Sequence, residues 1–408
     1  MFYLTTKNKE DCYGCGACQL VCPNQSITIS NDNEGFLYPE RSASNCGNCN
    51  YCERVCPNLN KEKIQWKEGQ PRAYLGIHKE DKTLQNSSSG GVFSGVAQVF
   101  CTDDYRVFGA QFGEGLKVEH THISHLSQMT KLRKSKYVFS DMGNSYREAR
   151  DFLEVGMKVL FTGTPCQIAG LKLYLGKAYE HLLSVDVICH GAPSQKVFDS
   201  YIKFLESKHK GKVKSFSFRH KTYSWLKGWN SKNVKYSIGK ESFIISPTED
   251  PYLRGYHKGL FYRPSCYQCK YANPQRISDI TMADFWGVDE LFPLLEVHKG
   301  CSVILSNTNK GQEWVDKLEE YMKIEEVKLN DVIERNNQLK EPAKRQIKRD
   351  VFFSSFEKKN FESVVNGCIP REQITIRKIA VRFTPYKMKR MIKRLRKYNK
   401  TEQTAPKI

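Results

Sequence analysis

Apolar and polar positions alternate along the chain in short runs that predict a succession of strands and helices. Near the N-terminus, residues 26–30 and 36–38 are β-type stretches on either side of a turn rich in Asn, Asp and Gly, which predicts a hairpin. Farther along, strand-like runs such as 158–161 alternate with helix-like runs such as 92–101. This alternation is typical of an α/β domain. Beyond about residue 213 the runs become mainly β-type.

The composition allows a folded protein with more than one domain. The chain has 408 residues, of which 39% are hydrophobic and 12% aromatic, and this is enough apolar material for real cores. No apolar stretch approaches the ~20 residues that span a bilayer. The polar N-terminus leads directly to Cys12 instead of resembling a secretory signal. Together with fifteen cysteines, these features predict a cytoplasmic protein whose thiols ligate metal.

The positive charge is concentrated at the C-terminal end. The 64 Lys and Arg exceed the 44 Asp and Glu by 20, and residues 374–408 alone contain twelve basic residues and one Glu, a net +11. The remainder of the chain is only mildly basic, so its composition does not indicate nucleic-acid binding.

The tail itself has the pattern of an amphipathic helix. Met388, Met391, Ile392, Leu395 and Tyr398 fall on one helical face among eight Lys or Arg between positions 387 and 400. This pattern is typical of a helix lying on an anionic membrane surface, here the inner face of the cell membrane. A docking site for an acidic partner and a solvated extension are the alternatives.

One cysteine spacing occurs twice near the N-terminus. Both runs read Cys-x-x-Cys-x-x-Cys-x-x-x-Cys-Pro, and each cysteine of the second run lies 34 residues after its counterpart. This is the bacterial ferredoxin spacing, in which three cysteines of a run bind one 4Fe–4S cluster and the fourth binds the other. The assignment is Cys12, Cys15, Cys18 and Cys56 on one cluster, and Cys46, Cys49, Cys52 and Cys22 on the second.

Two other interpretations of these cysteines fit less well. Structural zinc sites use isolated Cys-x-x-Cys pairs that combine into four-ligand sites. Disulfides need an oxidising compartment, for which the sequence has no secretory signal. The spacing therefore predicts that residues 1–60 form a two-cluster domain that carries electrons.

Four cysteines farther along could ligate a third metal centre. Cys166 follows a predicted strand, Cys189 ends the next strand, and Cys266 and Cys269 form a Cys-x-x-Cys pair. Four thiolates suit a third 4Fe–4S cluster or a tetrahedral zinc ion. In the alternative without metal, Cys166 is an ordinary buried residue.

Two further segments lie where α/β folds place their ligands. Residues 87–91 precede an apolar helix, so that backbone N–H groups and the positive helix end could receive an anion. Residues 162–167 lead from a strand into a helix, at the edge of the sheet where such folds bind ligands. The structural alternatives are a helix N-cap with close glycine packing, and a turn with Pro165 at the first helical position.

In this order behind the cysteine runs, the later motifs resemble the beta subunit family of the coenzyme F-420-reducing hydrogenases and formate dehydrogenases. The resemblance covers roughly residues 8–320, with Ala283 where the family pattern has glycine. The matching motifs are Ser89-Gly90-Gly91, Ser135-Lys136-Tyr137, Phe161 to Gln167, Cys189-His190-Gly191, Phe218-Arg219, Cys266-x-x-Cys269 and residues 279–287.

The resemblance implies an iron–sulfur flavoprotein with FAD as a cofactor. The residues expected to contact FAD are Ser89, Gly90, Gly91, Lys136, Thr162, Gly163, Thr164, Gln167, Arg219 and Asp284. Lys136 and Arg219 would place positive charge near the flavin ring or its pyrophosphate. His190 would move a proton to the substrate, and Lys136 is a second catalytic candidate. Solvated charges and a loop hydrogen bond of His190 are the corresponding structural alternatives.

The predicted fold is a small bacterial-ferredoxin-like domain followed by a mixed α/β flavin-binding domain, in the α+β and α/β classes. Its predicted regions are 1–60, the ferredoxin-like domain; 71–210, the FAD-binding α/β domain; 211–330, a β-rich continuation with the Cys-x-x-Cys motif; and 331–408, a helical extension with the basic tail.

The predicted function is transfer of single electrons through the clusters to FAD, for two-electron reduction of a small organic molecule. A ferredoxin or another low-potential carrier would be the donor. The resemblance to members in bacterial surface-polysaccharide gene clusters suggests a sugar or glycan precursor as the substrate. Two alternatives remain open, an electron-transfer subunit that serves a partner enzyme and a non-redox sugar-binding module.

Overall fold

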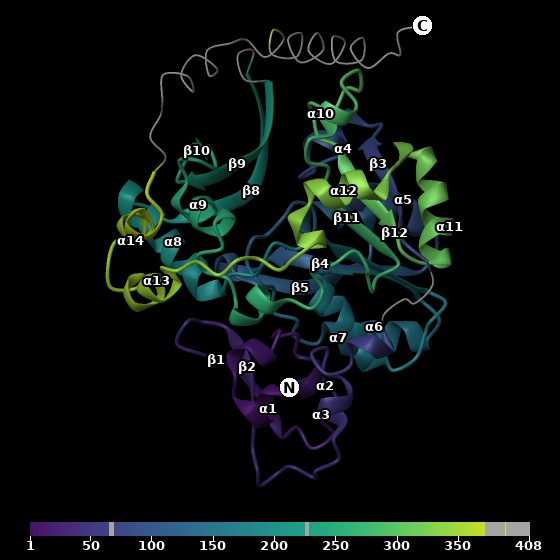
Figure 1. Ribbon diagram of the computed structural model, residues 1–408, viewed down its shortest axis with the longest axis vertical. Helices are drawn as coiled ribbons and strands as arrows, with labels where there is room; N and C mark the ends of the chain where they lie inside the picture. Colours follow the sequence, from purple (N-terminus) through teal and green to yellow (C-terminus); the bar gives the residue numbers. More distant parts are fainter. Residues whose placement is uncertain (65–68, 225–227, 372–387, 389–408) are drawn as a thin grey trace, which may run out of the picture.

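The computed structural model describes residues 1–64, 69–224, 228–371 and 388. Figure 1 shows an N-terminal domain at the bottom, drawn in purple, below two parts built on separate sheets. We call the part built on the larger sheet the central domain, and the part formed by β8–β10 with the neighbouring helices α8, α9, α13 and α14 the side domain. The basic tail, including the residues of its predicted amphipathic face other than Met388, lies outside the described residues.

The N-terminal domain is made of very short elements around one hairpin. Strands β1 (Ile27–Asn31) and β2 (Leu37–Arg41) pair antiparallel, which confirms the predicted hairpin. Helices α2 and α3 begin after Gly16 and Asn50, both in the left-handed region with φ of 77° and 59°, which Gly and Asn tolerate best. The helices are α1 (Tyr3–Thr6), α2 (Ala17–Leu20) and α3 (Tyr51–Arg54), with the 3-10 turns η1 (Lys9–Asp11) and η2 (Lys61–Lys63).

The central domain contains an eight-stranded mixed sheet in the order β13-β3-β12-β11-β7-β6-β4-β5. Neighbouring strands from β4 through β6 and β7 to β11 run parallel, and the remaining pairs are antiparallel. The strands are β3 (Arg72–His78), β4 (Tyr105–Phe112), β5 (Val118–Ile123), β6 (Lys158–Gly163), β7 (Leu182–Val187), β11 (Ile280–Asp284), β12 (Ser302–Ser306) and β13 (Met322–Val327).

Helices cover both faces of this sheet, because its inner strands carry apolar side chains in both directions. Leu160 of β6 belongs to one core with α5 and α11, whereas its neighbours Val159 and Phe161 belong to a second core with α6 and α7. The helices are α4 (Asp81–Gln85), α5 (Val92–Phe100), α6 (Ser145–Glu154), α7 (Pro165–Leu175), α10 (Val288–Leu291), α11 (Asn309–Lys317) and α12 (Leu329–Arg335). Short 3-10 turns are η3 (Glu114–Leu116), η4 (Leu126–Lys131), η5 (Pro264–Gln268), η6 (Leu318–Glu320) and η7 (Asn337–Leu339).

The side domain packs four helices and a three-stranded antiparallel sheet around an aromatic core. Tyr201, Phe218 and Tyr252 are fully buried members of this core. The strands are β8 (Val213–Ser224), β9 (Gly228–Ile238) and β10 (Glu241–Ile245), and the helices are α8 (Gln195–His209), α9 (Pro251–His257), α13 (Arg349–Ser355) and α14 (Phe361–Cys368).

The predicted mixed α/β architecture is confirmed. The central sheet takes strands from both sides of residue 211, so the regions predicted as 71–210 and 211–330 share one sheet. Within the described part of the chain, no helix combines the length and apolarity that crossing a bilayer requires.

Parallel pairing places the carboxyl ends of β6, β7 and β11 at one edge of the sheet. These ends are Gly163, Val187 and Asp284, and each is followed by a predicted site segment. Open α/β sheets bind ligands at this edge. The fold therefore brings three motifs that are distant in sequence to one place.

Candidate functional site

Four cysteines of the N-terminal domain gather on its inner side, and we call them the proximal site. They are Cys12, Cys15 and Cys18 of the first run with Cys56 of the second run. Burial raises the pKa of the thiols of Cys15 and Cys18, and the neighbouring thiolates of this group raise them further. The crossing of Cys56 to the first run is the arrangement that the ferredoxin spacing predicts.

The other four cysteines, Cys22, Cys46, Cys49 and Cys52, form what we call the distal site. Cys22 and Cys52 pack on the same small apolar cluster as Phe2 and Leu4. Cys49 is exposed, and the thiol of Cys46 lies 3.6 Å from the Asn48 side-chain oxygen. The distal site is therefore the one closer to solvent.

Cys166, Cys189, Cys266 and Cys269 line one small cavity of about 40 Å³ at the sheet edge, and we call them the third site. Cys166 is in the first turn of α7, Cys189 follows β7, and the Cys-x-x-Cys pair lies in and just after η5. Burial raises the pKa of Cys166 and of Cys266 to about 12, and the neighbouring thiolates of this site act in the same direction. Four thiols around one cavity fit the donor set of a 4Fe–4S cluster.

A single zinc ion is the alternative occupant of the third site. Among the described residues, no three His, Cys, Asp or Glu side chains converge on one point as a zinc ion would require. The four thiolates of a 4Fe–4S cube stand farther apart than those around a single ion. Four thiols that line one cavity suit either centre, and metal analysis distinguishes the two.

The proximal site and the third site face each other across the boundary between the domains. Helix α7, which begins at the third site, passes Cys15 so closely that a Cβ atom on Gly170 would lie 3.1 Å from the Cys15 sulfur. The rings of Tyr13 and Tyr271 are in contact beside it, with centroids 5.5 Å apart. Gly170 is thus required for close approach of the two domains.

A larger cavity of about 320 Å³ lies on the other side of the third site. Its wall contains nearly all of the predicted cofactor and catalytic residues. These are Ser89, Gly91, Lys136, Thr162, Gly163, Thr164, Gln167, His190, Arg219 and Asp284. Gly90, the remaining one, lies behind this wall, where a Cβ atom would come within 2.1 Å of the Gly76 carbonyl oxygen.

The segment before α5 is shaped by packing as well as by the cavity. The N–H of Gly90 donates to the Ser302 hydroxyl at 2.8 Å, and the Ser89 hydroxyl donates to the Cys301 carbonyl. Gly91 is the N-cap of α5 with φ of 86°, and it lines the cavity. The predicted anion contact therefore cannot use the N–H of Gly90, which is occupied.

The turn between β6 and α7 is held by its own side chains. Thr164 and Gln167 form a capping box at the start of α7, and the Thr164 hydroxyl lies 3.2 Å from the Cys166 sulfur. The Thr162 hydroxyl donates to the Phe108 carbonyl. These contacts fix the turn against both the large cavity and the third site.

Arg219 is the central charged residue of the large cavity. Its guanidinium donates to both carboxylate oxygens of Asp284, to the Ser88 carbonyl at 2.7 Å and to the Tyr137 hydroxyl at 3.1 Å. Burial would lower the pKa of Arg219, but Asp284 and Tyr137 outweigh burial and raise it. Arg219 is therefore a fixed cation that connects four of the recognised segments.

The ammonium of Lys136 is occupied by three backbone carbonyls. It donates to the carbonyl oxygens of Lys131, Leu132 and Arg133 at 3.1, 3.1 and 2.8 Å. The contacts cap the carboxyl end of η4, where carbonyls lack helical partners. Burial lowers the pKa of Lys136 to about 7. The geometry gives this side chain a structural task beside the cavity.

His190 lies on the wall shared by the two cavities. Burial lowers its pKa, Asp284 counteracts this effect, and Arg219 reinforces it. Its position on the shared wall makes the imidazole a candidate for moving a proton between the two cavities.

Several cavity residues have no signal in the sequence that identifies them. Lys232 lies over the Trp286 ring, 3.8 Å from its centroid, and Lys134 and His257 also line the cavity. Burial lowers the pKa of His257 to about 4, and His190 adds to the effect. Of this group only Trp286 belongs to a recognised motif.

Two parts of the chain match known protein families. Residues 156–332 match the C-terminal part of the coenzyme F420 hydrogenase/dehydrogenase beta subunit, and residues 11–60 match the 4Fe-4S dicluster domain. These matches confirm the family resemblance. Residues 156–332 are thus similar to that beta subunit, and residues 11–60 are similar to a domain with two 4Fe–4S clusters.

One solved structure similar to this chain is the F420-reducing NiFe hydrogenase complex from Methanosarcina barkeri. The matching chain has 15% sequence identity and a TM-score of 0.43, over 76% of this chain and 95% of that chain. A search of curated proteins found no match.

Proposed function

We propose that this relative of the beta subunit is an iron–sulfur flavin oxidoreductase. Single electrons from a low-potential donor such as a ferredoxin would enter at the distal site and leave at the large cavity for a two-electron reduction of an organic substrate. When bound, 4Fe–4S clusters exchange single electrons, and FAD joins one-electron to two-electron transfer.

The observation that carries this proposal is a wall shared by the third site and the large cavity. The two cavities have six lining residues in common, namely Phe139, Thr164, Cys189, His190, Gly191 and Ala192. Cys189 is a candidate metal ligand and His190 a candidate proton donor, and they are adjacent in the chain. Electron delivery and substrate chemistry would therefore meet at this wall.

The cysteine sites form a sequence from solvent to the cavity. The distal site has the exposed Cys49, and the proximal site has the buried Cys15. Gly170 lets Cys15 approach helix α7, which begins at the third site. This order supports passage of single electrons through the molecule along one route. An exposed first site also suits contact with an external donor.

The charge of the large cavity supports an anionic cofactor. Arg133, Lys134 and Lys232 line it together with Arg219, and Asp284 is the single carboxylate among its described lining residues. Asp284 and Arg219 neutralise each other, so the excess positive charge comes from the other three side chains. The pyrophosphate of FAD is an anion of the kind that such a wall binds.

The residues of the cavity would divide the remaining tasks. His190 would supply the proton that accompanies reduction, because it lines both the third site and the large cavity. Lys136 would hold the end of η4 in place. The substrate class that we propose, a sugar or glycan precursor, follows from the resemblance to members in polysaccharide gene clusters.

The test is iron, zinc and flavin analysis of the full-length protein, purified and reconstituted without oxygen. Three clusters correspond to about twelve iron atoms per chain, and the Cys266→Ser, Cys269→Ser double variant should retain about eight. Cys101→Ser is the matched control, because Cys101 lies outside the three sites, and it should retain about twelve.

The outcomes separate the alternatives. A wild-type iron content firmly at eight atoms per chain would rule out the third cluster. Stoichiometric zinc would instead indicate a zinc ion at the third site. Clusters without flavin would support an electron-transfer subunit whose chemistry takes place on a partner. Absence of both iron and flavin would leave the sugar-binding alternative.

A further inference from the structure

We propose that Arg263 is an electrostatic link between the proximal site and the third site, and that its charge raises the reduction potentials of the clusters at both. The inference rests on the proposed function, because it requires a cluster at each site.

Arg263 is buried between the two domains. Its side chain is among the largest of the fully buried ones, with an exposed fraction of 1%. Nε donates to the carbonyl of Cys12 at 2.7 Å, and Nη2 donates to the carbonyl of Leu37 at 2.7 Å. Arg263 also lies three residues before Cys266 of the third site. A side chain from outside the N-terminal domain therefore reaches the ligand loop of that domain.

The packing around this guanidinium leaves little freedom. It lies over the Tyr38 ring, with 4.2 Å from its central carbon to the ring centroid. A Cβ atom on Gly14 would come within 2.6 Å of Nη1, so the ligand loop passes directly over the cation. Gly14 has φ of 73°, which further favours glycine at this position.

The partners of Arg263 do not include a carboxylate in the described part of the chain. They are the two carbonyls and the rings of Phe36 and Tyr38. Its cysteine neighbours are Cys12 and Cys266, one from each site, and both would be thiolates when they ligate a cluster. A buried charge is costly unless an opposite charge compensates it. The cysteine sites are therefore where the compensating charge is found.

Arg276, the second buried arginine near the third site, provides a contrast. Its Nη2 lies 3.0 Å from the Asp186 carboxylate, and both side chains are at most 2% exposed. This pair is close to neutral as a unit. Arg263, in contrast, presents a net positive charge to both sites.

A fixed cation favours the reduced form of each adjacent cluster, because reduction adds one negative charge. The effect is large in a buried place, where little water screens it. With a cluster bound at each site, one electron would pass from the proximal site to the third site. No bond forms or breaks, and no proton is required. Because the same cation borders both sites, it would raise both potentials.

The test is a redox titration of the reconstituted full-length protein, followed by electron paramagnetic resonance. We expect Arg263→Gln to lower the equilibrium constant for reduction of both adjacent clusters at least tenfold, which is about 59 mV for a one-electron couple. The distal cluster should not shift. It provides the internal control, because Arg263 does not contact its ligands.

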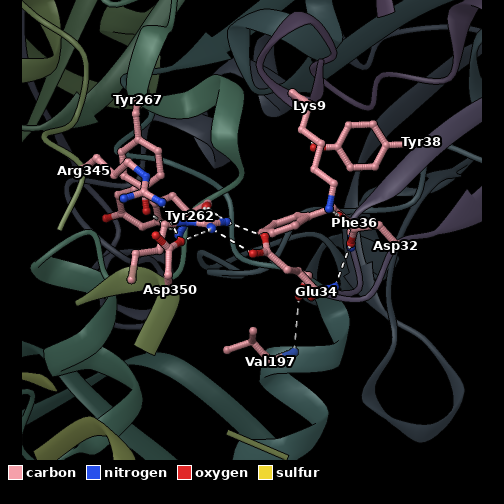
Figure 2. Close-up of polar contacts among 12 residues, drawn as sticks. Lys9, Asp32, Glu34, Phe36, Tyr38, Val197, Tyr262, Tyr267, Arg345 and Asp350 are labelled. Carbon is pink, nitrogen blue, oxygen red and sulfur yellow. Dashed lines mark hydrogen bonds and ion pairs between the residues drawn. The ribbon is translucent and has the colours of Figure 1, made fainter. Parts of the chain in front are cut away.

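Arg349 supplies a matched control for the docking of the two domains. Figure 2 shows Glu34 of the N-terminal hairpin facing the segment that contains Asp350, and Arg349 of this segment binds the Glu34 carboxylate at 2.5 Å. The Arg349 side chain is 4% exposed, so it is a second buried arginine between the same parts. Arg349→Gln removes a contact between the domains without removing a charge beside a cysteine ligand.

The results decide between charge and structure. Equal shifts in Arg263→Gln and Arg349→Gln, or an equal shift of the distal cluster, would overturn the proposal. Arg263→Lys retains the charge. The equilibrium constants for reduction of both clusters should therefore stay within threefold of the wild-type values. A tenfold lower equilibrium constant for reduction in Arg263→Lys, with its full iron retained, would also overturn the proposal. This comparison remains decisive if Arg263→Gln does not fold. Iron analysis of each variant distinguishes loss of a cluster, and so failure of the proposed function, from a shifted potential.

Discussion

The carboxylate of Asp284 receives two hydrogen bonds from the guanidinium of Arg219, at 2.9 and 3.1 Å. Asp284 is the last residue of β11 in the central sheet, whereas Arg219 belongs to β8 of the side domain. The pair therefore fastens the two sheets together at the wall of the large cavity. The Arg219 side chain is 6% exposed and that of Asp284 20% exposed, so water screens the pair only in part.

Asp284→Asn should destabilise the protein, because it leaves the Arg219 cation without its counter-charge. Removal of one partner of a buried pair costs about 3 kcal/mol in the free energy of unfolding. Urea titration of the reconstituted protein measures it. Glu326→Gln is the control, since Glu326 pairs with Arg72 on the surface, and exposed pairs contribute under about 1 kcal/mol. Equal losses in the two variants would contradict the structural role of the Asp284 pair.

The contribution of Asp284 should also depend on pH. Burial alone would raise its pKa, but Arg219 outweighs burial and holds the pKa of the folded state below its usual value. A lowered folded-state pKa stabilises the protein above the unfolded pKa of about 3.9 and is lost as the pH falls through the folded value. The difference in unfolding free energy between wild type and Asp284→Asn should thus be constant from about pH 7 to pH 5. It should shrink below about pH 4, and a difference that grows there would contradict this assignment.

Gly91→Val should lose FAD and keep the iron of the N-terminal domain. Gly91 lines the cavity with φ of 86°, and a Cβ atom would lie 2.9 Å from the His78 Cβ, so a larger residue would displace this wall. Gly115→Val controls for backbone strain, because Gly115 has φ of 65° but open space around its Cβ position. It should keep its FAD. Full retention of FAD in Gly91→Val would place the flavin elsewhere.

Gly170→Ala should loosen the contact between the domains. Alanine normally stabilises a helix relative to glycine by up to about 1 kcal/mol, but a methyl group here would meet the Tyr146 hydroxyl and the Cys15 sulfur at 2.8 and 3.1 Å. We expect a lower urea midpoint and partial loss of iron. In Gly367→Ala of α14 the added methyl meets no atom within 4 Å, so stability should be unchanged or higher. A lower urea midpoint in Gly367→Ala than in Gly170→Ala would contradict the close approach of α7 to Cys15.

The basic tail should bind anionic membranes. Each Lys or Arg near such a surface adds roughly 1 kcal/mol, screened by salt. Full-length protein should therefore bind anionic vesicles at low ionic strength, bind them less in salt, and not bind after truncation at Arg382. Iron and flavin content should survive this truncation. Equal binding by both forms would leave the tail as a solvated extension or a docking site for an acidic partner.

Local signals in the sequence were sufficient for much of the fold. The hairpin, the α/β alternation and the helix at 92–101 follow from spacing and periodicity, and the structure contains each of them, with α5 at Val92–Phe100. The two cysteine runs predicted the dicluster domain, because the geometry of a cluster restricts the spacing of its ligands over a few residues. These features depend on neighbours in the chain.

The arrangement of the site depended on contacts that only the folded chain makes. Lys232 and His257 line the large cavity, and the Lys136 ammonium donates hydrogen bonds to backbone carbonyls. The local sequence around these residues predicts neither the positions nor the contacts. The local sequence does not distinguish Arg263 from other arginines. Folding buries it beside Cys12, which is 251 residues away in the chain. The sequence by itself determined which ligands and elements are available. The order of strands and the docking of the N-terminal domain decided which of them meet, because side-chain burial and long-range pairing are properties of the packed whole.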